Sequence, residues 1–204
     1  MRLYKAMRAG DMKRVRNLQR LILKSRSARL LAIRQVTQLN AGKKTAGVDG
    51  VICIKPEKRF DLEYILKKDV LNWNHQGLRE IPIPKKDGTK RILKVPTISD
   101  RAWQCLIKYA LEPAHEVTFH ERSYGFRLGR SAHDCQKVVF LNLRSNSNGA
   151  TKRILELDIE KCFDRIDHAD LMGRVIAADS NLWVKRKCIF TTQMATITIG
   201  SPAI

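Results

Sequence analysis

An Asp-Gly dipeptide inside a proline-bearing stretch, residues 79–96, places the strongest constraint on how this chain folds. Asp87-Gly88 favours a tight turn, and the residues on either side of it are typical of two extended segments. Pro82 and Pro84 cannot donate backbone hydrogen bonds, so they confine the first segment to the edge of a sheet. The stretch is therefore predicted to be a hairpin of a small antiparallel sheet. It carries six basic residues: Arg79, Lys85, Lys86, Lys90, Arg91 and Lys94.

Helical periodicity marks most of the remaining chain. Apolar residues recur at helical spacing in two runs near the N-terminus, with a polar break near Ser25, and predict two basic amphipathic helices. Thr97 and Ser131 each stand three residues before an aspartate, which is the spacing of a helix N-cap. The apolar positions are Met12, Val15, Leu18, Ile22, Leu30, Ile33 and Val36. The other predicted elements are helices over 56–71, from Thr97 to Pro113, after Ser131 and over 167–177, a strand over 154–159 and a loop over 40–50.

The charge balance favours a polyanionic partner. The 204 residues include 39 Lys and Arg against 20 Asp and Glu, a net charge of +19, and the pI is near 10.1. Nucleic acid is the usual partner of such a chain. A solubility charge and an acidic membrane surface are the alternatives. The first 35 residues hold 11 Lys and Arg and one acid, Asp11, a composition that also resembles an organellar targeting peptide.

Two classes of protein are excluded by composition. No apolar run approaches the roughly 20 residues that a membrane-spanning helix needs. The five cysteines are scattered and never spaced Cys-x-x-Cys, so they indicate reduced, buried thiols and not a disulfide or zinc framework. We therefore expect an intracellular protein, in the bacterial cytoplasm or in an organelle (mitochondrion or plastid).

A carboxylate closes the predicted strand 154–159. Asp158 would be costly to bury there unless it were paired or bound to a cation. Two-metal phosphoryl transfer uses such oxygen ligands on rigid strands, but two ions about 4 Å apart need more than one carboxylate. A solvated aspartate, or a salt bridge to a nearby arginine, remains the alternative.

Taken together, the basic hairpin, the loop Ser123–Arg130 and the segment after residue 154 resemble the reverse transcriptases encoded by group II introns, the maturases. The resemblance extends from near Met1 to about Phe190. It implies an α+β fold, with helix-rich fingers, a small antiparallel sheet and a truncated palm. The first matching block is Gly47-Val48-Asp49-Gly50, and the second is Ile83-Pro84-Lys85 through Arg91 with Val95-Pro96-Thr97 and Asp100-Arg101. The third is Ser123-Tyr124-Gly125-Phe126-Arg127 with Gly129-Arg130-Ser131-Ala132-His133-Asp134, and the fourth is Asp158-Ile159 with Cys162-Phe163-Asp164, Ile166 and His168.

The resemblance also assigns roles to residues. It implies that Arg79, Lys85 and Arg91 grip the triphosphate of an incoming nucleotide. Asp158 falls on the first metal-binding aspartate, with the Ile159 carbonyl as an additional ligand. Phe163 falls on an aromatic gate beneath the sugar, and is otherwise a core residue. For Arg127 and Arg130 the chemical reading, phosphate contact, and the family reading, template backbone, agree. The residues expected to contact RNA are Arg8, Lys13, Arg14, Arg16, Arg20, Lys43, Lys44, Lys86, Lys90, Arg127 and Arg130.

The sequence departs from the family pattern in one respect that affects function. Neither an Asp-Asp pair nor the family's Tyr-x-Asp-Asp motif occurs in these 204 residues. A smaller departure is Leu128, which stands where the family usually has proline. We therefore expect an RNA-binding protein without polymerase activity of its own, serving a ribonucleoprotein such as an intron particle or a ribosome. Mg²⁺ is expected only if the remaining palm is supplied, and otherwise no cofactor. The alternatives are a fragment or split half of an active RNA-directed DNA polymerase and a decayed reading frame.

The expected organisation has three parts. Residues 1–40 form a basic helical extension, 41–145 a fingers-like region and 146–204 a partial palm. The expected partners are structured intron or ribosomal RNA and other proteins of a ribonucleoprotein, with no membrane.

Overall fold

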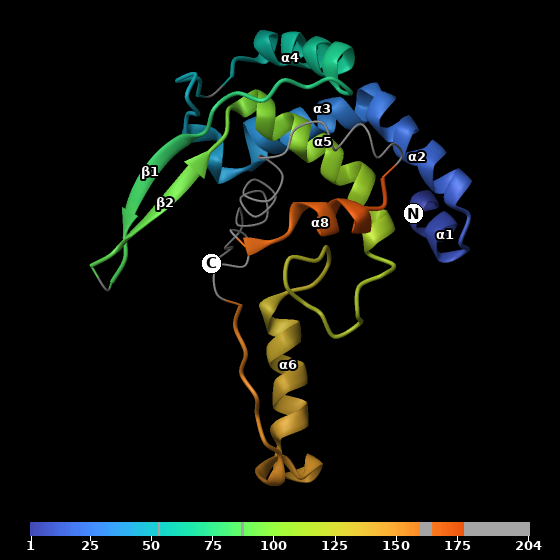
Figure 1. The fold of residues 1–204 in the computed structure, drawn as a ribbon, viewed down its shortest axis with the longest axis vertical. Coiled ribbons are helices and arrows are strands. Elements are labelled where there is room, and N and C mark those ends of the chain that lie inside the picture. Colours follow the sequence, from blue (N-terminus) through green and yellow to red (C-terminus); the bar gives the residue numbers. More distant parts are fainter. Residues whose placement is uncertain (53, 87, 160–164, 178–204) are drawn as a thin grey trace.

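A helical body, a two-stranded hairpin and a projecting helix make up the described part of the chain (Figure 1). The computed structural model describes residues 1–52, 54–86, 88–159 and 165–177. The α-helices are α1 (Arg2–Arg8), α2 (Met12–Lys24), α3 (Arg26–Arg34), α4 (Pro56–Asp69), α5 (Ile98–His115), α6 (Ala132–Leu143) and α8 (His168–Arg174). The strands are β1 (Arg79–Pro84) and β2 (Lys90–Val95). Short turns are the π-helical η1 (Gln35–Leu39) and the 3₁₀ turns η2 (Ala41–Lys44), η3 (Ser145–Ser147) and η4 (Gly149–Thr151).

The N-terminal region holds three α-helices where the periodicity predicted two. The helix predicted around residues 12–22 corresponds to α2, and the one predicted around 30–36 corresponds to α3 together with η1, which follows it directly. Helix α1 was not predicted. Gly10, at φ +72°, ends the first helix, and the Asp11 carboxylate caps α2 by accepting from the Arg14 backbone N–H at 2.9 Å. The break near Ser25 is confirmed, because Ser25 caps α3.

Helix α5 forms the centre of the core and contacts α1, α2, α3 and η1. Its start is confirmed at the Thr97 cap. The prediction that it ends at Pro113 is wrong, since the helix continues to His115. A proline in the last turn removes one hydrogen bond, and the fully buried Ala114 beyond it keeps this turn packed on α1 and α2. Buried side chains from α3 and α4, such as Ile33 and Leu66, complete the core around α5.

The predicted hairpin is confirmed. Strands β1 and β2 pair antiparallel, with Arg79 opposite Val95 and Pro84 opposite Lys90. The two strands form a two-stranded sheet, so the prolines of β1 do lie on an edge. Gly88 adopts φ +78° in the turn, a conformation that favours glycine, while Asp87 lies outside the described residues. Helix α4 confirms the helix predicted over 56–71, and η2 adds one 3₁₀ turn to the predicted loop 40–50.

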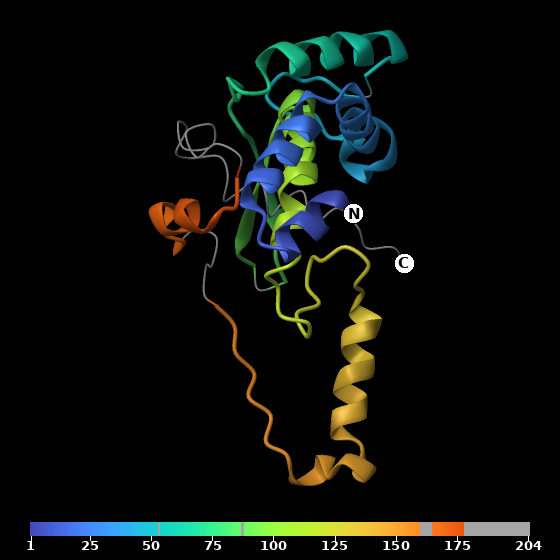
Figure 2. The same cartoon turned by 90° about the vertical axis from the view of Figure 1, so that its right-hand side faces the viewer.

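Helix α6 and the segment after it project away from the body (Figure 2). The capping box predicted at Ser131 and Asp134 is confirmed, yet no residue of α6 is buried. The strand predicted over 154–159 is wrong, because this segment is extended but pairs with no described strand. A strand needs a neighbour for its backbone hydrogen bonds, and β-branched composition alone does not supply one. Leu155 and Leu157 are consequently about four-fifths exposed, at 80% and 81%.

The last described residues return to the body. Helix α8 ends at Arg174, three residues before the predicted end at Ala177. Ile176 then docks between α2 and α5: its carbonyl accepts from Gln19 Nε2 at 2.7 Å, and its backbone N–H donates to His115 Nε2 at 3.2 Å. These bonds replace those that another helical turn would have made. The bond from Gln19 joins residues 157 positions apart in sequence, and the bond to His115 joins residues 61 positions apart.

Two compositional predictions find support in the described residues. No described helix is long and apolar enough to cross a membrane. Of the cysteines, Cys105 is a buried free thiol and Cys135 a half-buried one, whereas Cys53, Cys162 and Cys188 lie outside the described residues. The three-part division at residues 40 and 145 stays a prediction.

Candidate nucleic-acid interface

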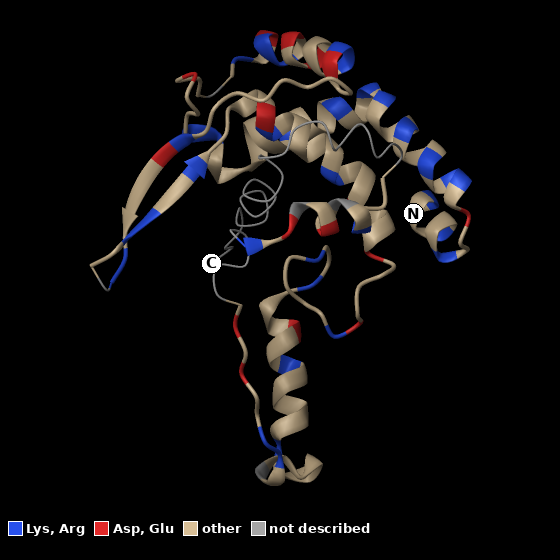
Figure 3. Cartoon of the chain, viewed as in Figure 1, with Lys and Arg blue, Asp and Glu red and all other residues tan. Residues whose placement is uncertain are grey.

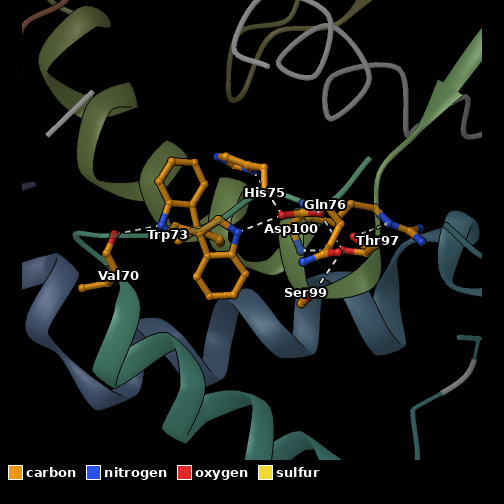
Figure 4. Close-up of polar contacts among 9 residues, drawn as sticks. Val70, Trp73, His75, Gln76, Thr97, Ser99 and Asp100 are labelled. Carbon is orange, nitrogen blue, oxygen red and sulfur yellow. Dashed lines mark hydrogen bonds and ion pairs between the residues drawn. The ribbon is translucent and has the colours of Figure 1, made fainter. Parts of the chain in front are cut away.

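A buried carboxylate at the start of α5 organises the base of the hairpin (Figure 4). Asp100 is fully buried, and its Oδ1 accepts from the indole of Trp73 at 2.8 Å and lies 3.1 Å from Nδ1 of His75. Its Oδ2 accepts from the Thr97 hydroxyl at 2.7 Å and from the backbone N–H of Gln76 at 3.3 Å. The carboxylate thus fastens the segment just before β1 to the residue just after β2. It fixes both ends of the cationic hairpin to α5.

The same contacts set the charge state of Asp100. Burial by itself raises the pKa of this carboxyl, but hydrogen bonds from His75, Trp73 and Thr97 outweigh burial and hold the pKa below its usual value. Asp100 is therefore an anion at neutral pH. An anion with four donors or near-donors around it is a rigid anchor, because the bonds from Trp73, His75 and Gln76 restrain the segment before β1 and the bond from Thr97 restrains the segment after β2.

Arg101 fastens a second loop to the same helix. Its guanidinium donates to the carbonyls of Gly42 and Thr45, each at 2.7 Å, and to Thr97 at 3.3 Å. Burial lowers the pKa of Arg101, with Asp49 and Asp100 opposing that shift. The fastened loop presents two predicted RNA contacts: Lys44 is exposed, and Lys43 is half-buried with its ammonium on the Gln38 carbonyl at 2.7 Å.

Gly47 allows this loop to lie directly on the α5 cap. A Cβ at Gly47 would stand 2.7 Å from Thr97 Cα and 2.8 Å from Thr97 N, which are backbone atoms that cannot swing aside. The first glycine of the Gly47–Gly50 block is thus required by packing. The block lies at the base of the hairpin, where the Ala46 carbonyl accepts a long hydrogen bond from Arg79 at 3.5 Å.

The hairpin distributes its predicted phosphate ligands along its length. Arg79 stands at the base, whereas Lys85 lies at the turn, with its N–H bonded to the Thr89 carbonyl at 2.8 Å. Six residues of strand correspond to roughly 20 Å at about 3.3 Å per residue. Arg91 lies directly opposite Ile83 and, by strand alternation, shares a face with Arg79. Lys90 lies on the opposite face, and all of these cations, with Lys86, are exposed.

Arg127 is used to hold its own loop together. Its guanidinium pairs with the Glu116 carboxylate at 2.6 Å and donates to the carbonyls of His120 and Ser123 at 2.6 and 2.7 Å. The hydrogen bond with Glu116 raises the pKa of Arg127. The side chain is only 6% exposed, so its role in this structure is to shape the loop 116–127. Arg130, which lies 5.7 Å over the Tyr124 ring, remains exposed.

The N-terminal helices display cations on their outer faces (Figure 3). In α2, Val15, Gln19 and Leu23 face the core at successive turns, which turns the basic residues of this helix outward. The predicted RNA contacts on this surface are all exposed: Arg8, Lys13, Arg14, Arg16 and Arg20.

The predicted metal ligands are not assembled in the described residues. Asp158 lies on the exposed extended segment, and its Oδ1 accepts from the adjacent Ile159 backbone N–H at 2.9 Å. Among the described residues no group of three or more His, Cys, Asp or Glu side chains could hold an ion. One carboxylate does not make a two-metal site, so the residues described do not fit a magnesium pair. Phe163 and Asp164 lie outside the described residues.

Sequence reasoning missed the residues that position this surface. It placed Asp100 at a helix N-cap and both Asp100 and Arg101 in a family block, but it gave no role to Arg101, Trp73 or His75. One signal was available: Asp100 and Arg101 place a carboxylate and a guanidinium at the start of a mostly apolar helix, where charged side chains need partners. Apart from Thr97, their partners lie 24 to 59 residues away along the chain, and only the fold identifies them.

Comparison with known families decides the chain's origin. Residues 1–66 match the N-terminal domain of reverse transcriptase, and residues 83–198, more than half of the chain, match reverse transcriptase (RNA-dependent DNA polymerase). The chain belongs to the reverse transcriptase family. The resemblance inferred from four sequence blocks is thereby confirmed, as is the α+β class of this reverse transcriptase segment.

Individual relatives of this chain point to the maturases. It is 42% identical to Maturase-like protein 1 of Euglena gracilis over 176 residues, which cover 86% of this chain and 38% of that protein. It is 34% identical to Protein YkfC of Escherichia coli over 79% of this chain and 43% of that protein. It is 36% identical to the group II intron-encoded protein LtrA of Lactococcus lactis over 49% of this chain and 16% of that protein. The chain thus spans about two fifths of the first two relatives.

Proposed function

We propose that this member of the reverse transcriptase family is an RNA-binding protein that serves a ribonucleoprotein as a structural or splicing-assisting component. The observation that carries the proposal is the set of exposed cations on α1, α2 and the hairpin, displayed by elements that all pack on α5 or are hydrogen-bonded to it at Asp100. Rigid display matters because cations that are already in place lose less entropy on binding phosphate. Maturase-like relatives agree with such a role.

RNA binding of this kind is electrostatic and follows the shape of the RNA. Each lysine or arginine that neutralises a phosphate releases condensed counterions, so affinity falls steeply with salt. The exposed cations lie on helices and on a hairpin and not in one narrow groove. This arrangement suits a folded RNA that presents phosphates from several strands. The proposed partners are intron or ribosomal RNA and proteins of the same particle, in the bacterial cytoplasm or an organelle.

The proposal includes no polymerase activity for these residues by themselves. The catalytic strand of the resemblance is here an exposed segment in which Asp158 is the one aspartate, and no described group of three or more His, Cys, Asp or Glu side chains gathers around it. Groups of a two-metal site act as a unit, so a single ligand leaves little of the rate enhancement. Magnesium would be required only in a complex that adds the remaining carboxylates.

A salt titration with matched charge variants tests the proposal. Fluorescence anisotropy of a labelled, structured group II intron domain should report binding that weakens about 10-fold or more between about 50 and 200 mM salt. Lys13→Gln/Arg16→Gln removes two exposed cations of α2 and should weaken binding further and reduce the salt slope by about two. Lys108→Gln/Arg174→Gln is the control: it removes the same charge from cations paired with Glu112 and Asp170.

Three results would contradict this proposal. They are affinity that does not change with salt, equal losses in the two double variants, and no binding to any structured RNA. Equal losses would mean that overall charge, and not the α2 surface, governs the association.

A second candidate is one half of a split RNA-directed DNA polymerase. The observation that favours it is the apolar projection: Leu155 and Leu157 are exposed, and α6 buries no residue. A protein carrying the Tyr-x-Asp-Asp motif could cover these residues and add carboxylates beside Asp158. Primer extension in Mg²⁺ by the wild-type chain with such a partner, lost in Asp158→Ala, would support it. Failure of extension with every co-purifying protein would remove it.

A further inference from the structure

The outer face of α4 exposes two aromatic rings one helical turn apart. Phe60 is 60% exposed and Tyr64 is 64% exposed. Residues four apart lie on the same face of a helix, so the two rings are neighbours. Aromatic side chains that could pack in a core are seldom left this exposed as an adjacent pair. The pair is not part of any block that the sequence analysis assigned to function.

The opposite face of α4 fixes this orientation. Leu62 and Leu66 are buried in the core shared with α3 and α5. Glu63 accepts from the Arg29 guanidinium at 2.7 Å, in an ion pair that is nearly inaccessible to water. Turning the aromatic rings inward would expose both leucines and break this buried pair. The helix lies at the periphery of the body in both views, and its outer face is open (Figures 1 and 2).

Two lysines continue the same face by one turn. Lys67 and Lys68 are exposed and follow Tyr64 by three and four residues. The exposed side of α4 also carries two acids, Glu57 and Asp61, before and beside Phe60, so the two cations lie at its C-terminal end, beyond both rings. Lysine is depleted in protein–protein interfaces, where aromatic residues are enriched, so the lysines argue against a protein partner. Aromatic rings beside cations are the usual means of holding unpaired nucleotides.

The spacing favours unpaired over duplex RNA. Phe60 and Tyr64 are separated by about 6 Å along the helix axis at about 1.5 Å per residue. Bases stacked in a duplex repeat at about 3.4 Å, so they are too close together for one base on each ring. An unpaired strand can spread its bases to this wider spacing. Bases inside a duplex also have their faces already covered by neighbours.

We propose that Phe60 and Tyr64 form a stacking surface for unpaired nucleotides of RNA, with Lys67 and Lys68 contacting the adjoining phosphates. This inference rests on the proposed function. It adds a site for single-stranded RNA to the cationic surface of α1, α2 and the hairpin, which is proposed to recognise folded RNA by its shape. It makes α4 the part of the molecule that distinguishes a loop or bulge from a duplex. A base stacks on each ring, and no covalent step is involved.

Two RNA probes and three variants of the full chain test it. The probes are a labelled single-stranded oligouridylate and a labelled RNA duplex of the same length. Phe60→Ala/Tyr64→Ala should lose about 10-fold or more in affinity for the single strand, and change less than about twofold toward the duplex. Phe60→Tyr/Tyr64→Phe keeps both rings and should bind as the wild type does. Leu21→Ala/Leu31→Ala removes two exposed apolar side chains elsewhere, at 58% and 54% exposure, and should also bind normally.

A spectroscopic readout accompanies the affinities. In Phe60→Trp the new indole is exposed, while Trp73 and Trp103 are buried and Trp183 lies outside the described residues. The added fluorescence is therefore measured as the difference from the wild type, and oligouridylate should quench it while the duplex should not. Single-strand affinity that is equal in the wild type and the double alanine variant would overturn this inference while leaving the proposed function intact. Absence of binding to both probes by the wild type would instead overturn the proposed function, and the α4 site with it.

Discussion

The indole nitrogen of Trp73 lies 2.8 Å from Oδ1 of Asp100, in a pair that is closed to solvent. The two residues flank the hairpin in sequence, so their bond closes the base of β1 and β2 against α5. Trp103 completes the arrangement: its indole donates to the Val70 carbonyl at 2.9 Å, and its ring packs against that of His75. The orientation of the hairpin cations follows from this buried set.

Replacement of Asp100 by asparagine should destabilise the protein by about 2–4 kcal/mol. Both carboxylate oxygens accept from donors, Trp73 at one and Thr97 at the other, so an amide NH₂ would face a donor in either orientation. Urea unfolding followed by circular dichroism measures the change. Asp61→Asn, on the exposed face of α4, is the control and should stay within about 0.5 kcal/mol. A similarly small change in Asp100→Asn would show that the buried set does not hold the fold.

Gly47→Ala should cost about 1–3 kcal/mol, because the added methyl group meets the Thr97 backbone at 2.7 Å. Denaturant unfolding checks this value. The matched substitution is Gly125→Ala, where nothing lies within 4 Å of the new methyl group and the cost should be under about 0.5 kcal/mol. Equal stabilities of the two variants would contradict the close approach of this loop to α5.

Stability should fall on acidification through the His115 contact. His115 Nε2 accepts the Ile176 N–H and must be unprotonated to do so, and burial lowers the pKa of His115 below its usual 6.5. The unfolded chain therefore binds more protons, and the stability present above pH 6.5 is lost as the pH falls from there through the lower folded-state pKa.

Urea midpoints across this pH range, for wild type and His115→Gln, measure that contribution. Glutamine can accept the Ile176 N–H through its side-chain oxygen without titrating. The acid sensitivity of the wild type should exceed that of the variant. Identical pH profiles would mean that the contact between His115 and Ile176 contributes nothing to stability.

Arg127→Lys should loosen the loop 116–127 although it conserves charge. The guanidinium reaches Glu116, His120 and Ser123 at once, and an ammonium cannot reproduce its planar fork. Hydrogen–deuterium exchange of this loop should speed up in the variant. Arg122→Lys, at an exposed position in the same loop, should exchange as the wild type does. Unchanged exchange in Arg127→Lys would rule out a structural role for this arginine.

Local signals predicted much of the fold. The caps at Thr97 and Ser131, the hairpin with its edge prolines and helix α4 depend on residues close together in sequence, and each was located correctly. The predicted strand over 154–159 was wrong because a strand depends on a partner that composition does not specify. The docking of Ile176 at Gln19 and His115 had no sequence signal, since a backbone group can bond any suitable side chain nearby.

The candidate site divides in the same way. The sequence shows directly which residues are cationic and that they are in excess. It also shows the four family blocks, which were enough to identify the family. Which cations remain available is decided in three dimensions: Arg8 and Lys13 stay exposed, while Arg127 is consumed by Glu116 and two carbonyls.

The sequence by itself determined most of the helices, the hairpin, the caps at Thr97 and Ser131, the charge of the surface and the reverse transcriptase origin of this chain. The tertiary structure alone decided that Asp100 and Arg101 anchor two loops on α5, and that Phe60 and Tyr64 face outward. The physical reason is that capping and turn formation are short-range, whereas burial of a charge or exposure of a ring depends on which distant segments pack around it.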